Sequence, residues 1–248
     1  MLHHPTPRFS VITVTYNAAA VLEDTIQSVI TQTYHHVEYI IIDGGSTDGT
    51  LDIVHRYRDR IALVVSEPDK GLYDAMNKGM ARATGDYLCF LNAGDSFHED
   101  DTLLQAVHSL AGQELPDVIY GETELVDKEG HFVRMRRLRA PRQLTWRSFR
   151  QGMLVCHQAF WPKASLAPRY DLRYRFSADF DWCIRILKQA RTTHNTRLTL
   201  IDYLDEGLTT RNHRASLLER FRIMTRHYGW PATFLLHAWF VLRAVIKK

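Results

Sequence analysis

The first 110 residues alternate between short apolar runs and segments with the spacing of amphipathic helices. Four apolar runs predict strands, at residues 9–15, 37–42, 61–65 and 87–91. Segments with helical spacing separate or follow them, at residues 21–30, 50–57, 72–83 and 101–110. Strands that alternate with helices are joined by right-handed crossovers. The order therefore predicts an α/β fold with a mostly parallel open sheet and helices on both faces.

After residue 110 the pattern is looser, and we expect this region to extend the same sheet. Residues 118–126 and 131–137 flank a Lys128-Glu129-Gly130 turn and predict an antiparallel hairpin. Residues 153–156 resemble a strand. Residues 177–190 predict a helix that begins with Ser177 as its N-cap.

Two segments are unusually basic or apolar. Residues 134–150 contain seven arginines and no acid, which indicates either an anion-binding patch or a solvated, acid-paired surface. Residues 234–246 are apolar nearly all round and precede two lysines, but they are too few to span a bilayer. Such a helix either packs against a core or another subunit, or lies in a membrane interface. We assign residues 1–210 to one nucleotide-binding domain and residues 211–248 to a C-terminal helical extension.

The cysteines and the N-terminus indicate a cytoplasmic protein. Cys89, Cys156 and Cys183 lie in apolar stretches without CxxC spacing, so neither a zinc site nor a disulfide framework is expected. The first ten residues lack the apolar segment of a signal peptide.

Polar residues follow each predicted strand of the parallel sheet. They are Thr15-Tyr16-Asn17, the segment 43–49, the segment 67–71 and the segment 92–95. Ligands bind beyond the carboxyl ends of such strands, so these residues are expected to surround a nucleotide, with Tyr16 packing on a base and Asp43 accepting from a base or ribose. Each segment by itself is also ordinary turn chemistry. Neither a G-x-G-x-x-G fingerprint nor a P-loop is present, which argues against a nicotinamide or ATP site.

Three strings, IIDGGSTDGT, SEPDKGLYDAMNKGMARATGDYLCFLNAGD and HQ…SADFDWCIRI, resemble family 2 glycosyltransferases. The similarity is greatest to bacterial exopolysaccharide enzymes of the colanic-acid type and covers residues 9–190. This resemblance implies a GT-A fold, a nucleotide-diphosphate sugar donor and an inverting, hexosyl-type transfer to a glycan acceptor in surface polysaccharide synthesis.

The resemblance also implies roles for donor-side residues. Those matching the nucleoside-binding part of the pattern are Thr15, Tyr16, Asn17 and Asp43, and those matching the next donor-binding segment are Asp69, Asp74 and Asn77. The metal-binding D-x-D element aligns with Asn92-Ala93-Gly94, so Asp95 is the only carboxylate left for Mg²⁺ or Mn²⁺. The resemblance also places Asn92 on the donor side of the site. Arg211 and His213 are expected to contact the diphosphate, although a basic loop beside a helix is an equal interpretation.

Asp179 matches the catalytic carboxylate of the family, which takes the proton of the acceptor hydroxyl. Its neighbour Asp181 shares the first helical turn, where acids also favour the helix dipole without any catalysis. His157 and Gln158 match positions near the acceptor.

The resulting hypothesis is an inverting transferase whose acceptor is a lipid-linked glycan. We expect a peripheral protein at the inner face of the cell membrane and no nucleic-acid partner. A sugar-phosphate nucleotidyltransferase and a non-catalytic nucleotide-sugar-binding protein are the alternatives. A nucleotidyltransferase would need a glycine-rich basic loop after the first strand, which this sequence lacks. The reduced metal motif favours the non-catalytic alternative.

Overall fold

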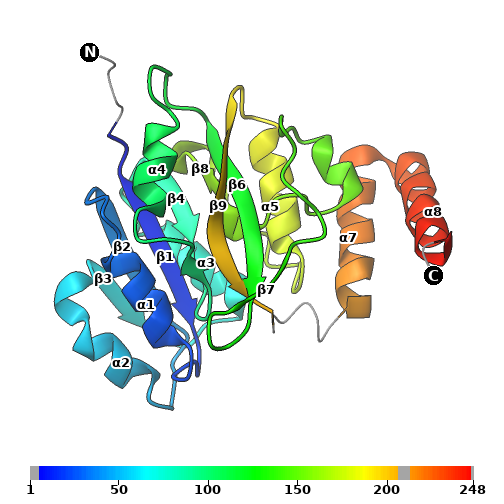
Figure 1. Cartoon of the computed structure of the whole chain (residues 1–248). Helices are drawn as coiled ribbons and strands as arrows, with labels where there is room; N and C mark the ends of the chain where they lie inside the picture. Colours follow the sequence, from blue (N-terminus) through cyan, green and yellow to red (C-terminus); the bar gives the residue numbers. More distant parts are fainter. Residues whose placement is uncertain (1–5, 206–212, 247–248) are drawn as a thin grey trace.

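A four-stranded parallel sheet forms the first half of the structure. The structure is a computed structural model that describes residues 6–205 and 213–246. The sheet has the order β3-β2-β1-β4, with β1 (Phe9–Thr15), β2 (Val37–Asp43), β3 (Leu63–Ser66) and β4 (Tyr87–Phe90). In the register of the sheet Thr15 lies beside Asp43, and Asp43 lies beside Ser66. The predicted parallel strands are confirmed, and their carboxyl ends meet at one edge (Figure 1).

Helices connect these strands as the sequence predicts. They are α1 (Leu22–Ile30), α2 (Thr50–Arg56), the short 3-10 turn η1 (Arg58–Arg60), α3 (Leu72–Met80) and α4 (Thr102–His108). Helix α3 packs on β1 and β2. Gly79 allows this close approach, because a Cβ there would lie 2.4 Å from the Ile12 Cγ2 atom.

A second, mixed sheet forms instead of the expected extension of the first. Its order is β5-β9-β6-β7, and β8 also pairs with β6. The strands are β5 (Ser96–Phe97), β6 (Val118–Val126), β7 (Phe132–Met135), β8 (Phe160–Pro162) and β9 (Thr193–Leu204). The predicted hairpin is confirmed as β6 and β7. The prediction of a strand at 153–156 was wrong, because this segment is irregular and leads into the 3-10 turn η3 (His157–Ala159).

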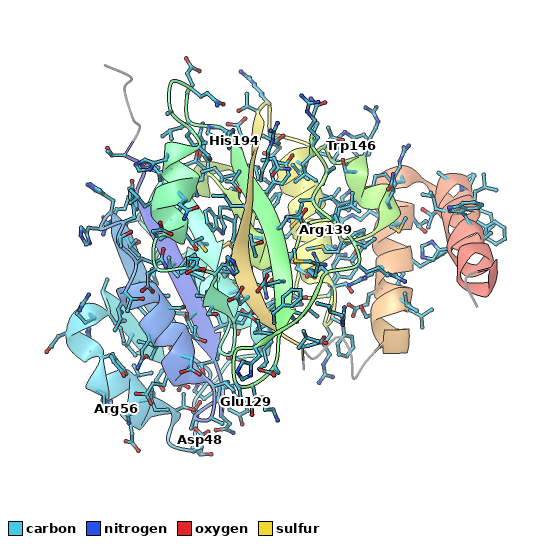
Figure 2. All side chains as sticks on the ribbon, in the orientation of Figure 1. Asp48, Arg56, Glu129, Arg139, Trp146 and His194 are labelled. Atoms are coloured by element: carbon cyan, nitrogen blue, oxygen red, sulfur yellow. The ribbon has the colours of Figure 1, made fainter. Side chains whose placement is uncertain are left out.

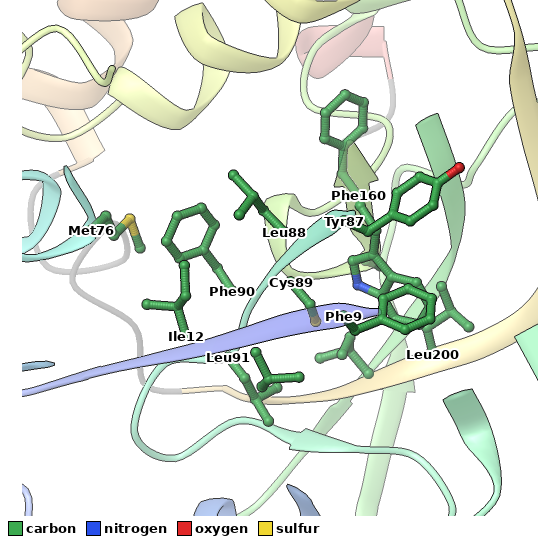
Figure 3. Packing of buried hydrophobic residues seen from close by; sticks show 14 of the residues in the cluster. Phe9, Ile12, Met76, Tyr87, Leu88, Cys89, Phe90, Leu91, Phe160 and Leu200 are labelled. Carbon is green, nitrogen blue, oxygen red and sulfur yellow. The ribbon is translucent and has the colours of Figure 1, made fainter. Parts of the chain in front are cut away.

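One hydrophobic core joins the two sheets. Phe9 of β1 stacks on Tyr87 of β4 at 5.6 Å between ring centroids, and its edge meets Trp161 of β8 at 5.5 Å. Figure 3 shows Leu200 of β9 beside this aromatic group, so both sheets contribute to the same interior. Because the sheets share a core, the site at the strand ends rests on a rigid support.

Three long helices complete the chain. They are α5 (Ala178–Leu187), α7 (His213–Tyr228) and α8 (Trp230–Ile246), and two further 3-10 turns are η2 (Ser148–Gln151) and η4 (Ala164–Leu166). Gly229 separates α7 from α8 with φ +83°, a conformation that favours glycine. Helix α7 packs on α5, and α8 lies beyond α7 at the edge of the molecule farthest from β3 (Figure 1). None of the helices in the described part of the chain is long and apolar enough to cross a membrane. A domain boundary at residue 210 stays a prediction.

Candidate active site

The loops after β1 and β2 are fastened to each other by Asn17. Its backbone adopts φ 48°, its N–H donates to the Ser46 Oγ at 2.8 Å, and its Oδ1 accepts from the Thr47 N–H at 2.9 Å. Tyr16 precedes it and is 63% exposed, so its ring is available for stacking. Asp48, on the same pair of loops, marks this end of the molecule in Figure 2.

Asp43 shapes the second loop from inside. The residue is fully buried, and its carboxylate accepts from the backbone N–H groups of Gly45 at 3.1 Å and Ser46 at 3.0 Å. The hydroxyls of Ser66, at 2.7 Å, and of Ser46 also donate to it. The neighbouring Thr15 Oγ1 is buried without a hydrogen-bond partner among the described residues. Asp43 therefore fixes the loop at Gly45 and Ser46, while the neighbouring Thr15 hydroxyl keeps an unused hydrogen-bonding capacity.

Gly44 lies between Tyr16 and Asp69. A Cβ at Gly44 would lie 2.4 Å from the Asp69 Oδ2 atom and 3.4 Å from the Tyr16 Cδ2 atom. The other oxygen of Asp69 accepts the Gly71 N–H at 2.7 Å, which fixes the carboxylate. The structure thus brings an exposed ring, a bare stretch of backbone and a fixed carboxylate together, a combination suited to a nucleoside.

The two predicted donor residues of α3 have different surroundings. Asp74 is half-buried and accepts the Lys70 N–H at 3.0 Å. Asn77 is buried, and both ends of its amide bond the backbone of Tyr170, at 2.7 Å and 3.1 Å. Asp74 orders the loop before α3, whereas Asn77 ties α3 to the segment around Tyr170.

Asp95, the predicted metal ligand, is enclosed by protein. It is 4% exposed and accepts from the Gln158 Nε2 at 2.8 Å and from the Leu204 N–H at 3.3 Å. Burial raises the pKa of this carboxyl to about 7. The residue therefore does not fit the donor set of a divalent cation, which needs free carboxylate oxygens.

Asn92 offers what Asp95 does not. Its Oδ1 is buried and has no hydrogen-bond partner in the described structure, so it is a free oxygen at the aligned D-x-D position. The two groups of three metal-ligating side chains in the described residues lie elsewhere, at His98-Glu124-Asp202 and Asp127-Glu129-His131.

Asp179 occupies the first turn of α5 and is held by two side chains from distant segments. The Tyr73 hydroxyl donates to its Oδ1 at 3.0 Å, and the His157 Nδ1 lies 3.5 Å from its Oδ2. The side chain of Asp179 is 17% exposed. Burial raises the pKa of this carboxyl, but His157, Arg220 and Tyr73 outweigh that effect, so that the pKa lies below its ordinary value. The group is an oriented carboxylate at neutral pH.

Asp181 has a structural role instead. It is fully buried, and its oxygens bond the Arg185 Nε at 2.6 Å and the His227 Nε2 at 2.7 Å. These contacts fasten α5 to itself and to α7. The structure thus gives these two neighbouring acids different surroundings.

His157 and Gln158 lie beneath the site. They are 7% and 0% exposed, and each contacts a different acid, His157 facing Asp179 and Gln158 bonding Asp95. The Nε2 of His157 is buried without a partner among residues the structure describes. The dipeptide therefore links the two carboxylates.

Glu219 of α7 binds the backbone directly before α5. Its carboxylate accepts the backbone N–H groups of Arg175, Phe176 and Ser177, at 2.8, 2.8 and 3.0 Å. Ser177 is at the predicted N-cap position, but its hydroxyl bonds Ser216 rather than its own helix. Sequence reasoning missed Glu219, as it missed Tyr73 and Arg220, because their partners are far away in the chain.

Arg211 and His213 are the two remaining predicted residues. Arg211 lies outside the described residues. His213 begins α7, but its side chain is outside the described part of the structure.

Comparison with known proteins gives a consistent family signal. The sequence profile described as "Glycosyl transferase family 2" matches residues 10–166. A relative from Mycobacterium tuberculosis (strain ATCC 25177 / H37Ra), named PGL/p-HBAD biosynthesis glycosyltransferase, is 34% identical over 228 residues, which is 89% of this chain and 86% of the relative. A Bacillus subtilis (strain 168) relative, TuaG, named for a proposed part in teichuronic acid biosynthesis, is 44% identical over 97 residues, 38% of each chain.

Solved structures share the fold at low sequence identity. S. aureus TarS 1-349 in complex with UDP-GlcNAc has a TM-score of 0.68 at 19% identity, over 88% of this chain and 64% of that chain. Mannosyltransferase PcManGT from Pyrobaculum calidifontis, in complex with GDP-Man and Mn2+, has a TM-score of 0.61 at 18% identity, over 96% of this chain and 76% of that chain. This chain thus spans less than two thirds of the TarS structure.

Proposed function

Because the chain belongs to glycosyl transferase family 2, we propose that it transfers a hexosyl group from a nucleotide-diphosphate sugar to a glycan hydroxyl with inversion. The observation that carries the proposal is the environment of Asp179, a carboxylate that Tyr73 and His157 orient from two other segments. Asp181, two positions later, has different surroundings: it is fully buried in contacts with Arg185 and His227, whereas the side chain of Asp179 is 17% exposed.

The proposed reaction is a single displacement at the anomeric carbon. The acceptor oxygen forms a bond to that carbon as the bond to the donor diphosphate breaks, and Asp179 takes the proton of the acceptor hydroxyl. The electron pair of the broken bond leaves with the nucleoside diphosphate. Burial keeps the Tyr73 phenol protonated by raising its pKa, so its hydroxyl keeps donating to the carboxylate and holds it in place.

The donor would bind at the strand-end loops. Tyr16 would stack on the base, Asp69 and the Thr15 hydroxyl would bond the nucleoside, and Asp43, Asn17 and Asp74 would keep the loops in shape. We retain Arg211 and His213 as candidates for the diphosphate. A divalent cation bound to the diphosphate would find the free Asn92 Oδ1 as its protein ligand and would offset negative charge on the leaving group.

The acceptor we propose is a lipid-linked glycan of a cell-surface polymer, with the enzyme working at the inner face of the cell membrane. The names of the mycobacterial and Bacillus relatives support a biosynthetic glycosyltransferase of this kind. The resemblance to exopolysaccharide enzymes supports it as well.

A donor panel tests the proposal. Purified protein would be incubated with uridine-, guanosine- and thymidine-diphosphate sugars, with and without Mg²⁺ or Mn²⁺, and nucleoside diphosphate release would be measured. We expect release from one donor, and a loss of about 10²–10⁴-fold in rate in Asp179→Asn with unchanged donor affinity. Release that Asp179→Asn leaves unchanged would identify a different base. Tight donor binding without release, also when candidate glycan acceptors are added, would identify a non-catalytic protein.

A further inference from the structure

The outer side of α8 is an uninterrupted apolar surface. Between residues 230 and 239 every exposed position is apolar. At 3.6 residues per turn these positions cover about half of the helix circumference. The exposed fractions of its large side chains are 58% for Trp230, 51% for Phe234, 68% for Leu235 and 54% for Trp239. Thr233 is buried on the opposite side, and His237 contacts Phe221 of α7.

A group of cations lies beside the start of α8. Turn η2 packs on α8, and Trp146 just before it stacks on Tyr228, the last residue of α7, at 5.5 Å and 7°. Arg147, Arg150 and Lys188 place their charges 4.9, 5.9 and 5.1 Å from the Trp146 ring centroid. Figure 2 shows Trp146 on the side of the molecule that carries α7.

These three cations have no acidic partner within the described structure, unlike the first half of the arginine-rich segment. Arg134 pairs with Asp205 at 3.0 Å, and Arg139 pairs with Glu122 at 3.1 Å. The arginine-rich segment is therefore acid-paired only in part. Arg134 lies on β7 and Arg139 pairs with an acid of β6, whereas Arg147 and Arg150 lie in or directly before turn η2, which packs on α8.

The helical pair itself carries little negative charge. Residues 213–248 contain seven lysines and arginines and one acid, Glu219. That acid is already committed to the backbone of residues 175–177. Glu219 therefore places no free acid beside the exposed apolar positions of α8.

We propose that this surface docks the protein on the interface of a bilayer containing anionic phospholipids. The docking surface consists of the apolar positions Trp230, Pro231, Phe234, Leu235, Ala238 and Trp239, and the cations Arg147, Arg150 and Lys188. Exposed tryptophans favour the headgroup boundary of a membrane, and nearby cations are attracted to anionic headgroups. A second copy of the chain is a poorer occupant, because a symmetric contact through α8 would bring the same cations toward one another.

The docking surface is rigidly linked to Asp179. Ser177 at the start of the catalytic helix bonds Ser216 and Glu219 of α7, and Asp181 bonds His227 of the same helix. Docking α8 would therefore hold Asp179 at a fixed height above the lipid. This last step rests on the proposed transferase function, whereas the membrane binding does not.

Tryptophan fluorescence of the full chain tests the docking. Of the five tryptophans, Trp161 and Trp182 are fully buried while Trp230 and Trp239 are exposed, so a blue shift on adding vesicles reports the docking surface. We expect the shift, and co-sedimentation, with phosphatidylglycerol/phosphatidylethanolamine vesicles, and at least tenfold weaker binding to phosphatidylcholine vesicles or at high salt.

Variants distinguish binding through the docking surface from nonspecific adsorption to vesicles. Trp230→Ser combined with Trp239→Ser should weaken sedimentation at least tenfold, and Arg147→Gln with Arg150→Gln should remove the preference for anionic vesicles. Phe132→Ser is the matched control, because Phe132 is also 58% exposed and its strand β7 lies away from α8 (Figure 1).

Either of two results would overturn the proposal. One is vesicle binding that the Trp230 and Trp239 variants leave unchanged. The other is a wild-type dimer in sedimentation equilibrium that these variants dissociate, without any vesicle binding. Because the assay contains neither donor nor acceptor, failure of the proposed transferase reaction would not affect its result.

Discussion

Glu219 of α7 accepts the backbone N–H of Ser177 at 3.0 Å, two residues before Asp179. The same carboxylate accepts two further N–H groups of the preceding backbone, so one side chain from the C-terminal helices fixes the backbone where α5 begins. The position of the candidate base therefore depends on a helix outside the nucleotide-binding sheet.

Replacing Glu219 should reduce turnover without reducing donor affinity. Glu219→Ala leaves three N–H groups unpaired and lets the first turn of α5 shift, so we expect kcat to fall about 10- to 100-fold while KM for the donor stays within about twofold. The free energy of unfolding should fall by about 1–3 kcal/mol. Glu219→Gln keeps one acceptor oxygen and should recover part of kcat. Equal losses in kcat and donor affinity would argue against a positioning role.

Removing His157 should move the acidic limb of the pH–rate profile. Burial opposes ionisation of Asp179 and His157 favours it, so His157→Ala should raise the pKa of Asp179. A base must be deprotonated to act, and the acidic limb of kcat/KM should therefore move to higher pH. Tyr73→Phe removes one hydrogen bond and should cause a smaller movement in the same direction. An unchanged profile in both variants would mean that Asp179 is not the titrating base.

Stability should depend on Asp95 between about pH 4 and pH 7. Its pKa is about 7 in the folded protein against an ordinary value of 3.8, so the folded state keeps a proton that the unfolded state has released. Stability is therefore lost as pH rises through this window. Asp95→Asn lacks this proton, and its free energy of unfolding relative to wild type should rise by about 2–4 kcal/mol between pH 4 and pH 8. Urea titrations at both pH values would measure this, and parallel pH slopes would contradict it.

Adding one methyl group at Gly44 should weaken donor binding. The new Cβ would lie 2.4 Å from the Asp69 Oδ2 atom, forcing that carboxylate away from Tyr16 and Gly44. We expect Gly44→Ala to raise the donor Kd about tenfold in calorimetry, a cost of about 1.4 kcal/mol. Gly49→Ala is the control in the same loop, because its Cβ would meet only the Ala19 Cβ at 3.7 Å. Equal donor affinities of the two variants would show that the nucleoside does not bind beside Gly44.

The strand ends were predictable because local patterns determine them. The apolar run of β1 and the polar residues directly after it are adjacent in the chain, and parallel topology then brings Tyr16 near Asp69. Strand β9 was missed because its regular alternation is broken. Arg197 has φ 61°, and Leu198 O would lie 2.7 Å from a Cβ at Gly121, so the pairing with β6 depends on a close approach that no short window of sequence reveals.

The surroundings of Asp179 depend on contacts between residues that are far apart in the chain. Tyr73 and Asp179 are separated by 106 positions, and Glu219 lies 42 positions after Ser177. Sequence reasoning could place both Asp179 and Asp181 in a first helical turn, but only their partners distinguish an oriented base from a buried ion pair.

The adjacency of His157 and Gln158 limits how this protein can be re-engineered. Two consecutive residues contact Asp179 and Asp95, so the proposed catalytic carboxylate and the loop at 92–95 share one support. A loop graft could import residues 92–95 from a relative, for instance to introduce a complete D-x-D element. Gln158 would then lose its bond to Asp95, and a shift of Gln158 would also displace the adjacent His157. Such a chimera would have to carry residues 156–158 from the same donor sequence to keep its base aligned.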